Sequence, residues 1–148
     1  MATLATIESF VRDFVDACNS PGLEVWDRLL TDDVLFVRND EKTNGLDKFQ
    51  ERMRRLRQAF PDLRLNVEET ILAGDTFVLR WHASGTHRGD YLGIAATGQQ
   101  VRYSGINIVK LAEDRQHLEI IETLVDNLAI LRCLGGQPTD REEAPAML

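Results

Sequence analysis

The sequence predicts an α+β domain in which N-terminal helices pack on one face of a curved antiparallel sheet and enclose a pocket. Apolar residues in the first 60 positions recur at helical spacing. After Pro61 the period changes to two, the alternation typical of half-buried strands. Neither a strand–helix–strand alternation nor an internal repeat is present, so the helices should gather on one side of a strand meander.

Each element follows from a local pattern. Helices are expected where apolar residues share one face and where Asn19–Gly22 or Pro61 then stops the chain. Strands are expected where apolar and polar residues alternate between turn residues such as Gly74-Asp75. In chain order these are helices near 7–15, 23–30 and 46–60, and strands over 34–38, 63–67, 77–87, 101–111 and 118–126.

Length and composition bound the class of protein. The chain has 148 residues, 43% of them hydrophobic and 28% charged, which fits one globular domain. We expect this domain to span residues 1–136. Residues 137–148 hold two prolines and four charges, and we expect a flexible tail there.

Charge and cysteine usage exclude several partners. A net charge of −7 with no basic stripe argues against nucleic-acid binding. No apolar run reaches the roughly 18–20 residues that span a bilayer, and charged residues within the first 20 positions exclude a signal peptide. Cys18 and Cys133 are far apart, with no Cys or His at ligand spacing, so we expect reduced thiols and a cytoplasmic protein.

Four short stretches, in order, resemble SnoaL-like proteins of the NTF2-like superfamily. They are AFPD at 59–62, a loop with Thr86-His87, Gly89 and Thr97-Gly98, SGINI at 104–108, and DNLAILRCLG at 126–135. The resemblance covers residues 5 to 136 and implies an NTF2-like, or cystatin-like, cone. It implies a small, cofactor-free and metal-free enzyme of the polyketide cyclase or isomerase type, acting on a largely apolar, oxygenated natural-product intermediate.

In SnoaL-like cyclases an aspartate near the end of the last strand acts as acid and base in an intramolecular aldol reaction. The matching residue here is Asp126, and a buried carboxyl can exchange protons near neutral pH. The histidine of the penultimate strand is replaced by Ala112 or, with a gap, Lys110. Two alternatives therefore stay open, which are a hydroxylase-type member and a non-catalytic binder of small apolar ligands.

Three titratable residues have competing interpretations. Asp126 is either the catalytic acid/base or the cap of the turn that follows it. His87 either polarises a substrate carbonyl as a second catalytic residue or organises the glycine-rich loop. Glu122 shares strand parity with Asp126, and it either lines the pocket or lies at its mouth or at an interface.

The remaining candidates would bind substrate. Trp81 shares strand parity with His87 and is a pocket or core aromatic. Tyr103 and Asn107 share one face of the next strand and offer hydrogen bonds to a substrate oxygen. Arg38 closes the first strand near the expected pocket mouth, and Phe60 ends the apolar face of the longest helix.

A homodimer is also expected. The convex face of such a sheet is not covered by the helices, and strand parity places Ile121 and Val125, with Ile106 and Ile108, on that face. An apolar surface of this kind is larger than monomers usually expose.

Overall fold

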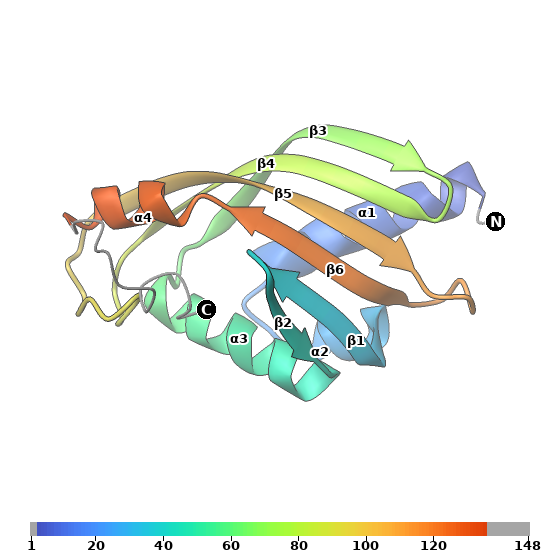
Figure 1. Cartoon of the computed structure of the whole chain (residues 1–148), viewed down its shortest axis with the longest axis horizontal. Helices are drawn as coiled ribbons and strands as arrows, with labels where there is room; N and C mark the ends of the chain where they lie inside the picture. The colour runs from blue at the N-terminus through green and yellow to red at the C-terminus, as the bar shows by residue number, and fades with distance from the viewer. Residues whose placement is uncertain (1–2, 136–148) are drawn as a thin grey trace.

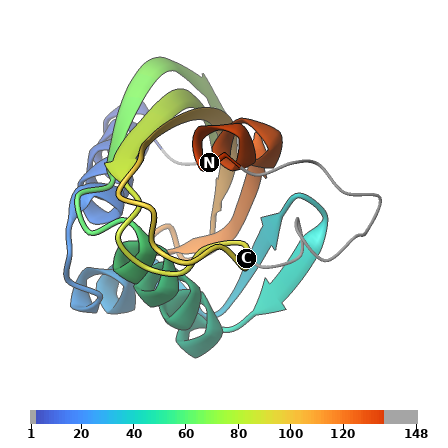
Figure 2. The same cartoon turned by 90° about the vertical axis from the view of Figure 1, so that its left-hand side faces the viewer.

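A computed structural model describes residues 3–135. One curved six-stranded sheet is covered on its concave face by three helices (Figures 1 and 2), and a fourth helix follows the last strand. The helices are α1 (Leu4–Asn19), α2 (Glu24–Leu29), α3 (Leu46–Ala59) and α4 (Asn127–Cys133). The strands are β1 (Leu30–Arg38), β2 (Glu41–Asn44), β3 (Arg64–Ala73), β4 (Thr76–Thr86), β5 (Gln100–Leu111) and β6 (Leu118–Val125).

The strand order is β2-β1-β6-β5-β4-β3. Every neighbouring pair is antiparallel except β1 and β6, which pair in parallel. The expectation of an all-antiparallel sheet is therefore wrong at one pair. The reason is that α3 and four further strands separate β1 from β6, so β1 joins the sheet beside a distant strand rather than within the meander.

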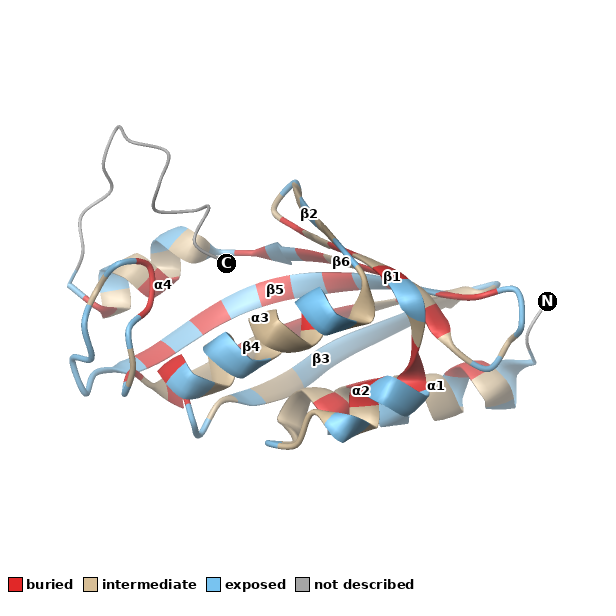
Figure 3. Cartoon of the chain, turned by 90° about the horizontal axis from the view of Figure 1, so that it is seen from below, coloured by how far each residue is buried: buried red, intermediate tan, exposed pale blue. Residues whose placement is uncertain are grey.

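The core lies between the concave face and the helices. Figure 3 shows α1, α2 and α3 crossing the same side of the sheet, with buried and exposed residues alternating along β5. Edge-to-face aromatic pairs connect the layers, because Trp26 of α2 packs against Phe14 of α1 and Phe49 of α3 at ring separations of 5.8 and 4.9 Å. Phe49 also packs against Phe36 of β1, 5.2 Å away.

The β4 and β5 strands pair along their full length, from Thr76 opposite Lys110 to Thr86 opposite Gln100. The segment 87–99 joins them and folds back onto the end of α3. There Arg88 and Gly89 both donate their backbone N–H to the carbonyl of Ala59. A Cβ on Gly89 would lie 2.6 Å from the Gln58 carbonyl oxygen, so only glycine allows this contact. The joining loop is thereby tied to α3 at one end of the pocket.

Most elements expected from the sequence are confirmed, although β1 begins at Leu30 rather than at 34 and β3 continues to Ala73 rather than ending at 67. The short strand β2 was not predicted, because its four residues are polar and charged and it pairs only with β1. Helix α4 was expected only as a turn. The tail predicted for 137–148 lies outside the described residues.

Candidate functional site

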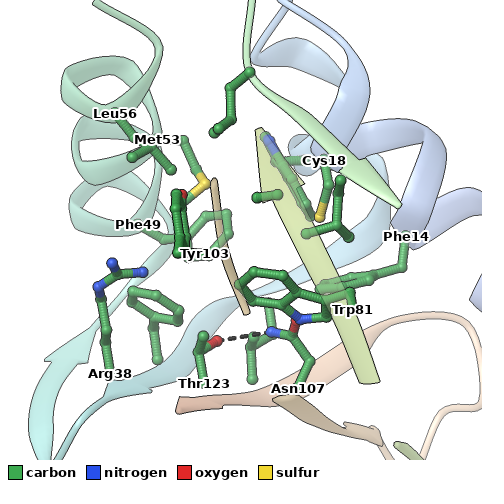
Figure 4. Close-up of a pocket in the computed structure, with 16 residues that line it drawn as sticks. Phe14, Cys18, Arg38, Phe49, Met53, Leu56, Trp81, Tyr103, Asn107 and Thr123 are labelled. Atoms are coloured by element: carbon green, nitrogen blue, oxygen red, sulfur yellow. Dashed lines mark hydrogen bonds between the residues drawn. The ribbon is translucent and has the colours of Figure 1, made fainter. Parts of the chain in front are cut away.

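A cavity of about 80 Å³ lies between the concave face of the sheet and the three N-terminal helices (Figure 4). Its walls are mostly apolar and aromatic, and one side carries hydrogen-bonding groups, a combination typical of small-ligand sites. It is lined by Phe14, Cys18, Trp26, Phe36, Arg38, Phe49, Met53, Leu56, Leu63, Leu65, Trp81, Ala83, Tyr103, Asn107, Ile121 and Thr123.

The polar side of the cavity is one cross-strand row. Asn107 of β5 is paired with Thr123 of β6, and Thr123 is paired with Arg38 of β1, so the three side chains share the concave face. All three are buried. We call Arg38, Thr123 and Asn107 the polar row.

Asn107 links the polar row to an aromatic wall. Its Nδ2 donates to the Thr123 hydroxyl at 2.7 Å, the dashed line in Figure 4, and its Oδ1 accepts from the indole N–H of Trp81. Both hydrogen bonds are buried, and they fix the amide orientation and the plane of the indole.

Trp81 can pack closely against β5 because the residue opposite it is Gly105. A Cβ at Gly105 would overlap Cζ2 and Cη2 of the indole. The absence of a side chain at Gly105 therefore leaves room for the Trp81 indole, which forms one wall of the cavity.

Arg38 is the cationic member of the polar row, and it is only 8% exposed. Its Nη2 donates to the hydroxyl of Tyr91 at 3.2 Å, while its Nε has no acceptor within residues 3–135. Tyr91 belongs to the loop 87–99, so this hydrogen bond joins the loop to β1. No carboxylate of the described chain forms an ion pair with Arg38.

Tyr103 and Tyr91 are the other polar groups near Arg38. Burial raises the pKa of both phenols, and the Arg38 charge opposes that rise. Both therefore stay neutral at physiological pH and can donate a hydrogen bond. Burial raises the pKa of the Cys18 thiol to about 12, so this cavity residue is protonated and is a poor nucleophile near pH 7.

The SnoaL-like polyketide cyclase family model matches residues 9–134. This chain belongs to the SnoaL-like polyketide cyclase family. No curated protein matches the chain. Among solved structures, TsrD from Streptomyces laurentii is 23% identical over 93% of this chain and all of its own, with a TM-score of 0.82. AclR, a candidate hydroxylase from Streptomyces galilaeus, is 22% identical over 95% of this chain and 87% of its own, with a TM-score of 0.81.

A candidate SnoaL-like polyketide cyclase from Jannaschia sp. CCS1 is 19% identical over 93% of this chain and 99% of its own, with a TM-score of 0.82. At these identities the likeness establishes the fold, which is the NTF2-like fold expected from the sequence motifs. The reaction depends on the residues of the cavity, because one fold hosts many activities.

Four of the predicted binding residues of this SnoaL-like protein meet in the cavity: Trp81, Tyr103, Asn107 and Arg38. Phe60 does not line it. That ring is fully buried and lies 4.9 Å from the ring of Tyr91. Thr123 was not predicted from the sequence, because the polar face of the last strand was assigned to Glu122 and Asp126.

His87 is fully buried and does not line the cavity. Its Nδ1 accepts from the backbone N–H of Thr97 and lies 2.9 Å from the hydroxyl of the same residue. Its backbone pairs with Gln99 and Gly98. This placement matches the loop-organising interpretation, because every hydrogen bond of His87 holds the two ends of the loop 87–99 together.

Asp126 lies at the N-terminus of α4, where its carboxylate accepts from the backbone N–H of Ala129 at 3.0 Å. The side chain is exposed and borders a shallow hollow on the convex face, together with Asn39, Arg80 and Leu124. The expected position of Asp126, inside the apolar pocket, is therefore not observed. The geometry is that of a helix N-cap.

The capping interpretation predicts a stability effect. Asp126→Ala removes the side-chain cap of α4 and should lower the free energy of unfolding by about 1 kcal/mol. Asp126→Asn should remain close to wild type, because asparagine caps equally well. Urea unfolding of both variants measures this, with Glu122→Gln as a surface control. Equal stability of the alanine variant and wild type would contradict the cap.

Glu122 lies on the convex face and does not line the pocket, which leaves its interpretation as an interface charge, whereas the apolar residues beside it lie on the face opposite to the one predicted. Ile121, Thr123 and Val125 face the cavity side, and Ile121 lines the cavity itself. Glu122 is paired with Ile108 on the convex face. The assignment of Ile121 and Val125 to the convex face was thus wrong, while that of Ile106 and Ile108 is confirmed. A shift of one residue in the assignment exchanges the two faces of the whole strand.

Within residues 3–135 no three His, Cys, Asp or Glu side chains are placed to hold a metal ion. None of the described helices has the length and apolar character needed to cross a membrane.

Proposed function

We propose that this SnoaL-like protein is a small, cofactor-independent enzyme of natural-product biosynthesis, of the cyclase or isomerase type. Its substrate is a small, largely apolar, oxygenated molecule that binds in the cavity between the sheet and the helices. The observation that carries the proposal is the polar row along one side of an otherwise apolar and aromatic cavity. Such a site binds an apolar skeleton and fixes the position of one oxygen.

The chemistry proposed is formation of an enolate. When a C–H bond next to a carbonyl breaks, its electron pair forms a carbon–carbon double bond, the π pair of the carbonyl moves to the oxygen, and the proton leaves to water. The Arg38 guanidinium and the neutral Tyr103 hydroxyl face the space where that oxygen would carry its charge. Reprotonation at another carbon isomerises the substrate, and attack on a second carbonyl closes a ring. The catalytic role of Asp126 that the resemblance implies is not part of this proposal, because its carboxylate lies outside this cavity.

The test is proton exchange in a model ketone. Phenylacetone has one aromatic ring and one carbonyl, and NMR in D₂O follows the loss of its α-protons. The protein should accelerate exchange over buffer, and the rate should saturate with phenylacetone concentration. Tyr103→Phe should lower the rate, while Ser104→Ala, on the exposed face of the same strand, should not. Exchange at the buffer rate would argue against an enzyme of this type.

A second candidate function is the binding of a small apolar ligand without catalysis. It is favoured by the composition of the cavity lining, which contains neither a carboxylate nor an imidazole in the described part of the chain. Saturable binding of phenylacetone without accelerated exchange would support this candidate. The hydroxylase alternative is supported only by the likeness to AclR.

We propose in addition that the protein is a homodimer formed through the convex face of the sheet. Ile71, Val78, Ile106, Ile108 and Leu124 lie on that face in two adjacent cross-strand rows. Four of them are at least 37% exposed, and this convex patch includes the charges of Arg80 and Glu122. Burial of such a patch against a second copy would remove it from water.

The proposed dimer predicts that a charged substitution in the convex patch changes the oligomeric state. Ile106→Lys introduces a charge into the middle of the convex patch and should convert a dimer into a monomer without a large loss of stability, because the residue contributes little to the monomer core. Light scattering at micromolar concentration measures the mass of both proteins. A monomeric wild type would contradict the proposal.

A further inference from the structure

We propose that Arg38 binds an anionic oxygen group of the ligand, so that the ligand class is an organic acid with an apolar body. The acidic group is a carboxylate or an ionised 1,3-dicarbonyl, which share the chemistry of one negative charge on two oxygens. The inference rests on the proposed function, because it assumes that the ligand occupies the cavity. What it adds is that the ligand carries a negative charge.

Positive charge is in excess around Arg38. Arg38 and Arg52 lie close enough for the charge of Arg38 to lower the pKa of Arg52, although burial of Arg52 lowers it more. The nearby carboxylate of Glu41 is paired with Arg52. Arg38 therefore holds a buried charge for which residues 3–135 supply no paired counter-ion. Buried charges in proteins are normally paired, since an unpaired one is costly.

Arg38 also has an unused donor. Arginine has five N–H groups in a planar fork that matches two carboxylate oxygens. The buried Nε of Arg38 has no acceptor among residues 3–135. The one side-chain hydrogen bond that Arg38 makes within that range runs from Nη2 to the neutral phenol of Tyr91 on the loop 87–99. Nη1 of Arg52 is also buried without an acceptor within residues 3–135. A cation with donors left over at a cavity wall indicates a bound acceptor.

The surroundings of the guanidinium suit an acid with an apolar body. Figure 4 shows Arg38 and Tyr103 on the same side of the cavity, and the charge of Arg38 opposes the rise in the Tyr103 pKa that burial causes. The Tyr103 hydroxyl can donate a hydrogen bond to the same anionic group. The lining also includes Phe14, Trp81 and Leu65, whose apolar side chains suit an apolar body.

The test compares ligands of equal shape and different charge. Benzoate and benzamide are titrated against the full-length protein, and binding is followed through tryptophan fluorescence, since both Trp26 and Trp81 line the cavity. Benzoate should bind roughly tenfold to a hundredfold more tightly than benzamide, the usual worth of a charge-assisted hydrogen bond. Arg38→Met should abolish this ratio and Arg38→Lys should retain part of it. Thermal melts establish that each variant is folded.

An ionised 1,3-dicarbonyl is tested with 1-phenylbutane-1,3-dione, whose enolate is read by ultraviolet absorbance. Binding at Arg38 should shift its ionisation to lower pH in the wild type and not in Arg38→Met. Tighter binding of benzoate than of benzamide, or a shift of the diketone ionisation, supports the inference. The probe that responds shows which kind of anionic group Arg38 binds. Benzamide binding as tightly as benzoate, without any shift of the diketone, would overturn the inference while leaving the cavity as the site. Binding of none of these probes would overturn both the inference and the proposed function.

Discussion

Gly105→Ala should lower the free energy of unfolding by about 3 kcal/mol, at the upper end of the cost of overpacking a core. The new methyl group would overlap the indole of Trp81 and would lie 2.8 Å from the backbone oxygen of Leu124. The indole is hydrogen-bonded to Asn107, and the backbone of β6 is held on both sides by β1 and β5. Neither the indole nor the backbone of β6 can move away from the new methyl group without losing other contacts.

The measurement is urea unfolding followed by circular dichroism. Ser104→Ala is the matched control, because it changes the neighbouring residue on the exposed face of the same strand. We expect that control to lie within a few tenths of a kcal/mol of wild type. A Gly105→Ala protein as stable as its control would show that Trp81 does not lie against β5 as described.

Asn107→Leu should also lower the free energy of unfolding by about 3 kcal/mol. An unsatisfied buried polar group costs about 1–3 kcal/mol, and this substitution creates two such groups. Leucine has nearly the shape of asparagine, but it leaves the indole N–H of Trp81 and the hydroxyl of Thr123 without their buried partner. Because the indole orientation depends on this bond, the fluorescence of Trp81 should change too.

Thr123→Val is the matched control for Asn107→Leu. It removes one hydroxyl of the polar row and leaves the bond from Trp81 to Asn107 intact, so we expect a loss of about 1 kcal/mol. Equal losses for the two variants would contradict the view that Asn107 holds two partners in place.

The sequence predicts the fold and half of the site for a physical reason. On β4 and β5 burial alternates from residue to residue and most residues of the buried face are apolar, so the faces of Trp81, Tyr103 and Asn107 were assigned correctly. On β6 both faces are apolar, with Ile121 and Val125 on one and Ile120 and Leu124 on the other. Periodicity cannot orient such a strand, and the motif ending in Asp126 led to the wrong face.

Two features of the site could not be predicted from residue order. The environment of Arg38 depends on the parallel pairing of β1 with β6, which brings Arg38 beside Thr123 from 85 positions away along the chain. Its contact with Tyr91 depends on how the loop 87–99 folds back over α3. The capping role of Asp126 was one of two interpretations of the same residue, and the hydrogen bond to Ala129 supports it.

In the proposed mechanism the chemistry takes place in the cavity with the polar row and not at Asp126. One comparison of rates tests this placement most directly. The phenylacetone exchange rate of Arg38→Met is measured beside that of Asp126→Asn, on proteins shown to be folded. We predict that the Arg38→Met rate falls toward that of buffer and that the Asp126→Asn rate stays close to wild type. A wild-type rate in Arg38→Met together with a loss of exchange in Asp126→Asn would contradict this assignment.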